Sequence, residues 1–478
     1  MTFQYQSALL SLSLACAVTA TASTSNSSWR GSVDSLIAQG EFTRAERVMQ
    51  RLPKQVRRQQ AVAIDSLRQV MERTRLDFSL SPQEGTKLIL QQEPNTTAEQ
   101  IEQWKKSHAL EVMNIDGGEW WFRKSVRNLW LLGEEFKERN RVEAHNEAQS
   151  LLQHYREVMH TAPDAQGRRN WHRVNITFTL DIAPNVIPHG ETYRVWLPFP
   201  FENGRQRNIQ LESSNYPITM SEGSKHHTVY MEAQAHRDKP THFEYTFGYD
   251  VAEYHMAQQD LLALVQPYKP TALYEQYTAS QPPHIVVTDS MKQLAQEIAG
   301  HDENPVTAAS RIYHWIAGRF PWAGAREYST LPCIPSYVLT QGHGDCGQVA
   351  LLYITLCRAY GIPARWESGY MLHPGEVNYH DWAETYFEGV GWVPTDVSFG
   401  RSTEGTALHD YYATGIDLYR LATNEATGAP LSPGKQHLRS ETVDFQAGEV
   451  EWKKGNIYSN HWKSNIHINS ITKIDNQQ

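Results

Sequence analysis

The sequence contains no cluster of basic residues and, beyond its first residues, no long apolar run. Its formal net charge is −9 over 478 residues, and its lysines and arginines are scattered, so nothing favours nucleic acid or an acidic membrane surface as a partner. No downstream stretch reaches the roughly 20 apolar residues that cross a bilayer. The sequence also lacks zinc-binding and calcium-binding patterns and a glycine-rich phosphate loop. We therefore expect no metal site, no cofactor and no transmembrane segment.

The first residues of the chain contain an apolar run. An apolar stretch from Ala8 to Val18 leads to the small residues Ala20-Thr21-Ala22, which is the pattern of a secretory signal and its cleavage site. The absence of Lys or Arg before the apolar stretch departs from that pattern. We expect residues 1–22 to be a signal peptide and the protein to be secreted or periplasmic. Lipid attachment at Cys16 is a less favoured alternative, because Ser13 stands where such a motif prefers a larger aliphatic residue.

Cysteine is scarce, with 4 in the chain. Removal of a signal peptide leaves Cys333, Cys346 and Cys357. Three cysteines cannot all pair with one another, so at least one stays outside any disulfide within the chain, in a compartment that favours oxidation. Cys333 and Cys357 could pair as a disulfide and leave Cys346 as the thiol, although Cys357 could equally be a buried thiol.

The spacing of apolar residues divides the rest of the chain into several parts, as its length suggests. Residues 23–163 repeat apolar side chains every three to four positions, which predicts a helical domain. Residues 164–260 alternate and are broken by Pro, Gly and Asn turns, which predicts an antiparallel β-sandwich. An aromatic connector at 261–287 precedes a mixed helix-and-strand region at 288–420. Alternation returns at 421–478, where we expect C-terminal strands that pack on the core.

Cys346 stands at the start of a predicted helix and between two glycines, Gly344 and Gly347. Apolar residues then recur on one helical face, at Val349, Leu352, Tyr353 and Leu356. A helix N-terminus favours a thiolate, and the flanking glycines would let a substrate carbonyl approach the backbone. Asp345 would oppose ionisation if its carboxylate faced the sulfur, but not if it capped the helix. The sequence leaves both orientations open.

A nucleophilic thiol needs a base, and the base needs a group that orients it. His380 lies on a predicted strand that is followed by a turn and a second strand carrying Asp396. A three-residue loop, Phe387-Glu388-Gly389, would place His380 opposite Asp396, whereas a Gly389-Val390 loop would not. Each of the three residues alone has an ordinary structural explanation. Their combination favours a Cys346, His380 and Asp396 triad.

Two quoted stretches also resemble a known family. The segments "GDCGQVALLYITLCRAYGIPARWESGY" and "HDWAETYFEGVGWVPTD" resemble the transglutaminase-like cysteine enzymes, relatives of the papain-like fold, and most of all their secreted bacterial multidomain members. The resemblance covers about residues 290–400. It implies that Cys346 is the nucleophile, His380 the general base and acid, and Asp396 the residue that orients the imidazole.

Three further residues are weaker site candidates. Gln341 stands upstream of the cysteine, as an oxyanion-stabilising glutamine does in papain-like enzymes, although its spacing differs. Trp382 and Trp392 could shield the imidazole or contact substrate, but core packing explains both equally well.

These expectations combine into an α+β protein with a helical N-terminal domain, a β-sandwich middle domain and a papain-like, transglutaminase-like core with C-terminal strands. The implied reaction is cysteine-dependent acyl transfer on amide bonds. With water as acceptor the protein is a peptidase or amidase, and with a lysine amine it is a protein-glutamine transglutaminase. The substrate would be a peptide or protein, including cell-wall peptide or glycopeptide. The alternative is a catalytically inactive secreted scaffold that binds peptide or glycan.

Overall fold

A computed structural model describes most of the chain, namely residues 27–133, 136, 153–154, 156, 161–164, 166–301, 303–402 and 407–474. The expected signal peptide at residues 1–22 and Cys16 lie outside the described residues. Within the described ranges, no helix combines the length and apolar character needed to cross a bilayer. The chain forms two compact units. One comprises Met1–Val142 with Pro321–Asp345, and the other comprises Glu143–Phe320 with Cys346–Gln478.

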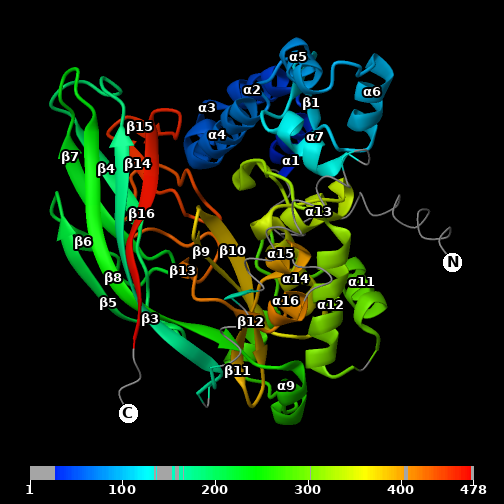
Figure 1. The fold of residues 1–478 in the computed structure, drawn as a ribbon. Helices are drawn as coiled ribbons and strands as arrows, with labels where there is room; N and C mark the ends of the chain where they lie inside the picture. Colours follow the sequence, from blue (N-terminus) through cyan, green and yellow to red (C-terminus); the bar gives the residue numbers. More distant parts are fainter. Residues whose placement is uncertain are drawn as a thin grey trace. The chain divides into compact units, whose positions relative to one another are not determined.

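The first unit is mainly helical, as the sequence predicts for the N-terminal region (Figure 1). Its elements are α1 (Ser27–Ala38), α2 (Phe42–Arg51), α3 (Lys54–Gln59), α4 (Ala61–Asp77), α5 (Pro82–Gln92), α6 (Ala98–Lys106), the hairpin β1 (Val112–Ile115) and β2 (Gly118–Trp121), α7 (Ser125–Leu132), η3 (Tyr328–Thr330) and α13 (Ile334–Gln341). Capping boxes begin two of the helices, at Ser81 with Glu84 and at Thr97 with Gln100. Each box satisfies backbone donors that would otherwise be unpaired at a helix start.

The segment Pro321–Asp345 belongs to this helical unit although residues 143–320 separate it in sequence from the rest of the unit. Asn128 Nδ2 donates to the carbonyl of Gly324 at 2.9 Å. The Tyr337 hydroxyl donates to the carboxylate of Glu111 at 3.0 Å. The stretch of chain that ends just before Cys346 is therefore held by side-chain hydrogen bonds within the helical unit.

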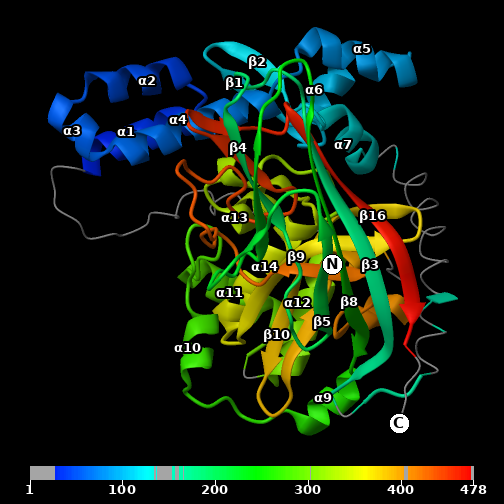
Figure 2. The same cartoon turned by 90° about the vertical axis from the view of Figure 1, so that its left-hand side faces the viewer.

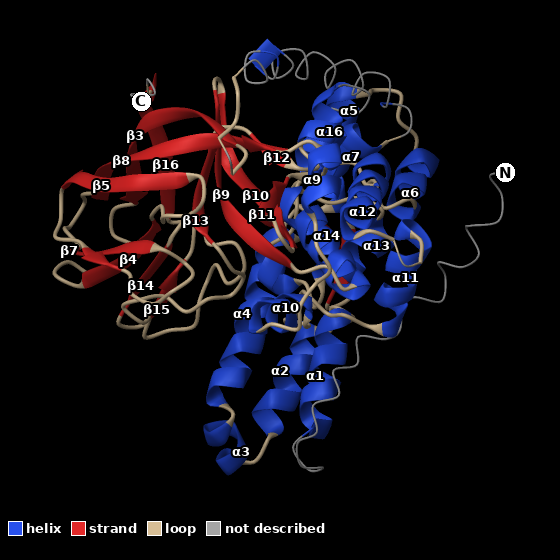
Figure 3. Cartoon of the chain, turned by 90° about the horizontal axis from the view of Figure 1, so that it is seen from below, coloured by secondary structure: helices blue, strands red, loops and turns tan. Residues whose placement is uncertain are grey.

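The second unit contains a β-sandwich of two antiparallel sheets (Figure 3). One sheet has the order β12-β8-β3-β16 with β5 also paired to β8, and the other has the order β15-β14-β4-β7-β6. The strands are β3 (Arg168–Ile182), β4 (Thr192–Pro198), β5 (Gln206–Ser214), β6 (Thr219–Met220), β7 (Thr228–Gln234), β8 (Thr241–His255), β12 (Gly415–Ile416), β14 (Glu449–Trp452), β15 (Gly455–Ile457) and β16 (Trp462–Lys473).

Alternation along β3 explains how the two sheets hold together. Its inward residues are buried and join one apolar core with residues of β4, β7 and β8; they are Val174, Ile176, Phe178, Leu180 and Ile182. Since successive side chains of a strand point to opposite faces, the intervening polar residues lie on the outer face. The predicted sandwich is confirmed.

The C-terminal strands also pair with strands of the sandwich, which the sequence did not indicate. β16 pairs along β3, from Trp462 opposite Ile182 to Lys473 opposite His172, and β14 pairs with β4. These strands complete the sandwich, and they contribute Val450, Ile457 and Trp462 to the apolar cluster that also contains Tyr370 and Leu372. Alternation shows that one face of a strand is buried but does not identify the sheet edge that the strand joins.

The remaining sheet of the second unit has the order β11-β10-β9-β13 and is covered by helices. Its strands are β9 (Ala364–His373), β10 (Glu376–Phe387), β11 (Gly391–Thr395) and β13 (Arg420–Asn424). The helices are α9 (Gln258–Leu264), α10 (Ala272–Thr278), α11 (Asp289–Ala299), α12 (Pro305–Arg319), α14 (Cys346–Tyr360), α15 (Val397–Ser402) and α16 (Ala407–Tyr411). Figure 2 shows α14 beside β9 and β10, with which it packs. α14 begins at Cys346 and α12 begins at Pro305, as predicted.

Phe178→Ala tests the sandwich core. The Phe178 side chain is 2% exposed and stacks on Tyr245 with ring centroids 5.5 Å apart. Its removal should lower the free energy of unfolding by about 3–5 kcal/mol, because a cavity replaces the lost contacts. Leu211→Ala on β5, at a site 40% exposed, is the control and should cost less than about 1 kcal/mol. Equal denaturation midpoints for the two variants would contradict the packing described.

Candidate active site

The hairpin that carries His380 has a register different from the predicted one. β10 and β11 pair from Phe387 opposite Gly391 to Ala383 opposite Thr395, so the loop is residues 388–390. Gly389 and Gly391 both have positive φ, 86° and 110°, and the turn is completed one residue later than expected. His380 therefore does not lie directly opposite Asp396. The displacement is two residues along the strand, which keeps both side chains on the same face.

His380 and Asp396 nevertheless form a hydrogen-bonded pair. His380 Nε2 lies 2.7 Å from Asp396 Oδ2, and the two residues are 3% and 0% exposed. Asp396 is the residue between β11 and α15, and its Oδ1 accepts the backbone N–H of Phe399 at 3.2 Å. This second bond fixes the carboxylate at the start of α15, so it can fix the imidazole in turn.

A buried arginine from β13 lies behind the pair. Arg420 Nη2 donates to Asp396 Oδ2 at 2.9 Å, and its Nη1 donates to Asp417 Oδ1 at 3.1 Å. Asp417 also accepts the Tyr412 hydroxyl at 2.7 Å and lies 3.2 Å from His373 Nε2. Arg420 is fully buried. Its charge is thus balanced by two carboxylates, as a charge removed from water requires.

Burial and these charges set the protonation states. Burial lowers the pKa of His380 below its ordinary value, with Asp396 opposing this shift and Arg420 adding to it. Burial alone would raise the pKa of Asp396, but the charges of His380 and Arg420 outweigh it and hold that pKa below the ordinary value. At neutral pH the site therefore contains an ionised Asp396 and an uncharged imidazole.

Cys346 is partly exposed at the first position of α14. Its thiol donates to Asp381 Oδ2, with a sulfur-to-oxygen distance of 3.5 Å. Asp381 is the neighbour of His380 on β10. The thiol therefore contacts the residue that follows His380 on β10.

Gln446 is a contact of this segment that the sequence did not indicate. Its Nε2 donates to Asp381 Oδ1 at 2.7 Å and to the carbonyl of His380 at 2.9 Å. Gln446 is 3% exposed, so both bonds are shielded from competing water. They tie the carboxyl beside the thiol to the backbone beside the imidazole.

The two tryptophan candidates have different surroundings. Trp382 is fully buried, its ring is stacked near His380 with centroids 6.0 Å apart, and its Nε1 donates to Glu367 at 2.7 Å. Trp392 packs edge-on to Tyr277 and Tyr386 at the far end of the hairpin. Of the two, Trp382 is the one that covers the imidazole.

Gln341 and Asp345 lie in the helical unit. Gln341 is the last residue of α13, and its oxyanion role stays a prediction. The Asp345 carboxylate accepts a hydrogen bond from the Tyr328 hydroxyl. At least one carboxylate oxygen of Asp345 is therefore hydrogen-bonded within the helical unit.

The three cysteines in the described part of the chain are thiols. Cys357 is fully buried on α14, and burial raises its pKa to about 12. Cys333 is also buried, and its sulfur accepts the Ser336 hydroxyl at 3.4 Å. Cys346 is the most exposed of the three, which suits a thiol that must meet a substrate.

Arg420→Met tests the charge network behind the pair. Removing the guanidinium leaves Asp396 and Asp417 buried without its charge, so the free energy of unfolding should fall by about 3–5 kcal/mol at neutral pH. Arg420 lowers the pKa of both carboxyls from 3.8. Its stabilisation is therefore complete above that pH and is lost as the pH falls through the lowered values.

The deficit of the variant should accordingly stay constant down to about pH 4 and shrink below it, as measured by denaturant unfolding from neutral pH to about pH 2. Arg237→Met, at an exposed position, is the control and should match the unsubstituted protein throughout. A deficit that is the same at every pH would show that Arg420 stabilises by packing alone.

Parts of the chain resemble known proteins. Residues 292–397 match the model of the Transglutaminase-like superfamily. An uncharacterised protein of Haemophilus influenzae is 24% identical over 290 residues, which are 53% of this chain and 77% of that protein.

Two solved structures resemble the chain with TM-scores below 0.5. A candidate cysteine protease from Cytophaga hutchinsonii has a TM-score of 0.43 and 17% identity over 65% of this chain and 93% of its own. The periplasmic domain of TgpA from Pseudomonas aeruginosa has a TM-score of 0.25 and 14% identity over 48% and 91%. The chain thus carries a transglutaminase-like domain at residues 292–397.

Proposed function

We propose that the protein transfers acyl groups from amide bonds through a thioester on Cys346. The observation that carries this proposal is the buried His380–Asp396 pair, 2.7 Å between Nε2 and Oδ2, next to the residue that the Cys346 thiol contacts. The match of residues 292–397 to a transglutaminase-like model supports it. A cysteine at a helix start, an imidazole and an orienting carboxylate are the parts that covalent acyl transfer needs.

The hydrogen bond to Asp396 assigns the imidazole tautomer. With Nε2–H donating to the carboxylate, Nδ1 keeps its lone pair and can accept a proton. As the sulfur attacks the substrate carbonyl, the S–H bond breaks, the proton moves to Nδ1 and a C–S bond forms. The imidazolium then gives this proton to the amine nitrogen as the amide C–N bond breaks, the amine leaves, and the thioester remains on Cys346. Asp396 stabilises the imidazolium during the interval between the two transfers.

The electrostatics favour proton transfer during attack. A thiolate–imidazolium pair at rest would need an imidazole that is easily protonated, but burial and Arg420 lower the pKa of His380. The resting site then contains an uncharged thiol and an uncharged imidazole. His380 acts as a general base in the transition state.

Water is the acceptor that we propose for the thioester, because water reacts by default unless a site excludes it. The protein is then a peptidase or amidase acting on a peptide or protein, with cell-wall peptide or glycopeptide included. The apolar stretch Ala8–Val18 and the small residues after it support a secreted or periplasmic location.

A peptide-library experiment tests this function. The purified protein is incubated with a mixed peptide library with and without an added amine, and products are read by mass spectrometry. We expect cleavage or deamidation products from the unsubstituted chain and none from Cys346→Ala. His380→Ala should slow product formation by about 10²–10⁴-fold, because the general base is lost.

His467→Ala, at an exposed position on β16, is the matched control and should leave the product pattern unchanged. Amine-linked products would identify transfer in place of hydrolysis. Identical products from Cys346→Ala and the unsubstituted chain would refute the proposed nucleophile, and an unsubstituted chain that captures peptides without altering them would indicate a binding scaffold.

A further inference from the structure

The carboxyl group of Asp381 is placed between the nucleophile and a buried amide. Its Oδ2 accepts the Cys346 thiol at 3.5 Å, and its Oδ1 accepts Gln446 Nε2 at 2.7 Å. Asp381 is only 3% exposed. A side chain fixed at both oxygens has little freedom to leave the sulfur, so its effect on the thiol is built into the site.

Hydrogen bonds to the backbone of Gln446 and its neighbours hold this residue in place. The carboxylate of Glu441 accepts the backbone N–H groups of Gln446 at 2.8 Å, Ala447 at 3.0 Å and Gly448 at 3.1 Å. The carbonyl of Gln446 accepts the hydroxyl of Tyr370 from β9. Because three successive backbone amides donate to one carboxylate, the backbone conformation at Gln446 is fixed.

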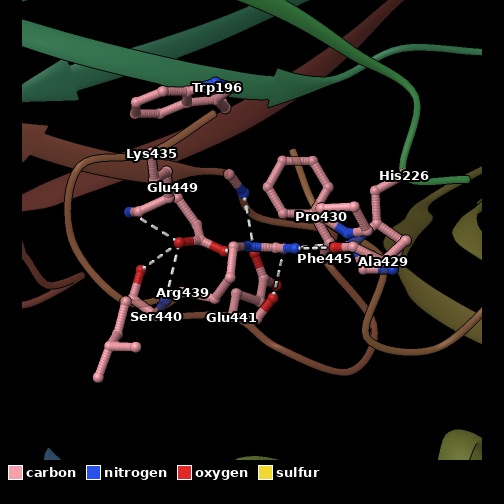
Figure 4. A network of polar contacts seen from close by, with 12 residues as sticks. Trp196, His226, Ala429, Pro430, Lys435, Arg439, Ser440, Glu441, Phe445 and Glu449 are labelled. Carbon is pink, nitrogen blue, oxygen red and sulfur yellow. Dashed lines mark hydrogen bonds and ion pairs between the residues drawn. The ribbon is translucent and has the colours of Figure 1, made fainter. Parts of the chain in front are cut away.

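A buried ion network holds the segment that carries Glu441 (Figure 4). Glu449 is fully buried and pairs with Lys435 at 2.8 Å and with Arg439. Burial would raise the pKa of Glu449, but the charges of Arg439 and Lys435 lower it to about 2. Arg439 also donates to the carbonyl of Glu441 at 2.8 Å. The network therefore reaches from the sandwich strand β14, which begins at Glu449, to the carboxyl beside the thiol.

The charges around the sulfur have opposing effects on its proton. On β10, Asp381 carries a carboxyl in contact with the thiol, while His380 is uncharged because burial lowers its pKa. Behind His380, Asp396 and Arg420 form an ion pair at 2.9 Å. Asp345 precedes Cys346 in the chain and is held by Tyr328. A nearby carboxylate disfavours a thiolate, so Asp381 opposes the effect of the helix N-terminus.

We propose that Asp381 is a catalytic residue that holds the Cys346 thiol protonated and oriented until substrate arrives, and that Gln446 is the positioning residue that keeps Asp381 there. This inference rests on the proposed function of Cys346 as nucleophile. At rest the S–H bond is intact and points to Oδ2. When the acyl carbon binds, the same proton passes to His380 as the C–S bond forms, and Asp381 gains and loses no proton.

Asp381→Asn tests the proposal without any substrate. Alkylation of the full-length protein by iodoacetamide is followed against pH, and the modified cysteine is identified by peptide mass spectrometry. Because Asn has the same size without the charge, alkylation of Cys346 should become half-maximal about one pH unit lower and about tenfold faster near neutral pH. An unchanged profile, or a profile moved to higher pH, would overturn the proposal.

Gln446→Met is the second variant, because it removes the amide donor while keeping the length and burial of the side chain. It should move the alkylation profile in the same direction by a smaller amount, and Gln259→Met at an exposed position on α9 should not move it. If Asp381→Asn does not fold, the alkylation profile of Gln446→Met decides. A Gln446→Met profile identical to that of the unsubstituted protein would then refute the proposal.

The alkylation profile and peptide turnover separate this inference from the proposed function. A shifted profile in a protein that transforms no peptide would support the role of Asp381 at the thiol and refute the acyl-transfer function. Peptide turnover by the unsubstituted chain, together with unshifted alkylation profiles in the variants, would support the acyl-transfer function and refute the role of Asp381.

Discussion

The Asp396 carboxylate is the group on which the site depends, because it is fully buried and is shared by a histidine and an arginine. An ionised carboxylate without such partners would be too costly to bury. Three elements must therefore meet at one point: β10 with His380, the junction of β11 and α15 with Asp396, and β13 with Arg420. The same arrangement that makes the buried charge tolerable also orients the imidazole, so stability and function share these contacts.

The sandwich has a structural link to this site. β14 pairs with β4 in the sandwich, and the segment directly before β14 carries Gln446 to Asp381 and to the carbonyl of His380. The buried pairs of Glu449 with Lys435 and Arg439 fix that segment. In our account a domain that supplies no reacting group still controls the reaction, because it sets the position of a side chain beside the nucleophile.

Local patterns in the sequence were sufficient for the helix that begins at Cys346 and for the pairing of His380 with Asp396. The hairpin register was missed by two residues, because two glycines with positive φ allowed a later turn. The pairing survived, since a displacement of two residues preserves the face of a strand. The partners of the site from other elements gave no local signal: Arg420 and Gln446 follow the motif residues by long stretches and are brought in by the pairing of β13 with β9 and of β14 with β4.

Formation of an acyl-enzyme tests the central claim most directly. An activated ester is mixed with excess protein, the reaction is quenched in acid at successive times, and the acylated peptide is identified by mass spectrometry. Our account predicts a thioester on Cys346 that forms more slowly in His380→Ala, by about 10²–10⁴-fold, and that is slowed by a smaller factor in Asp396→Asn. It also predicts that the two substitutions together cost little beyond His380→Ala alone, because the aspartate acts through the histidine. Acylation at another residue, or at Cys346 with equal rates in all variants that fold, would contradict it.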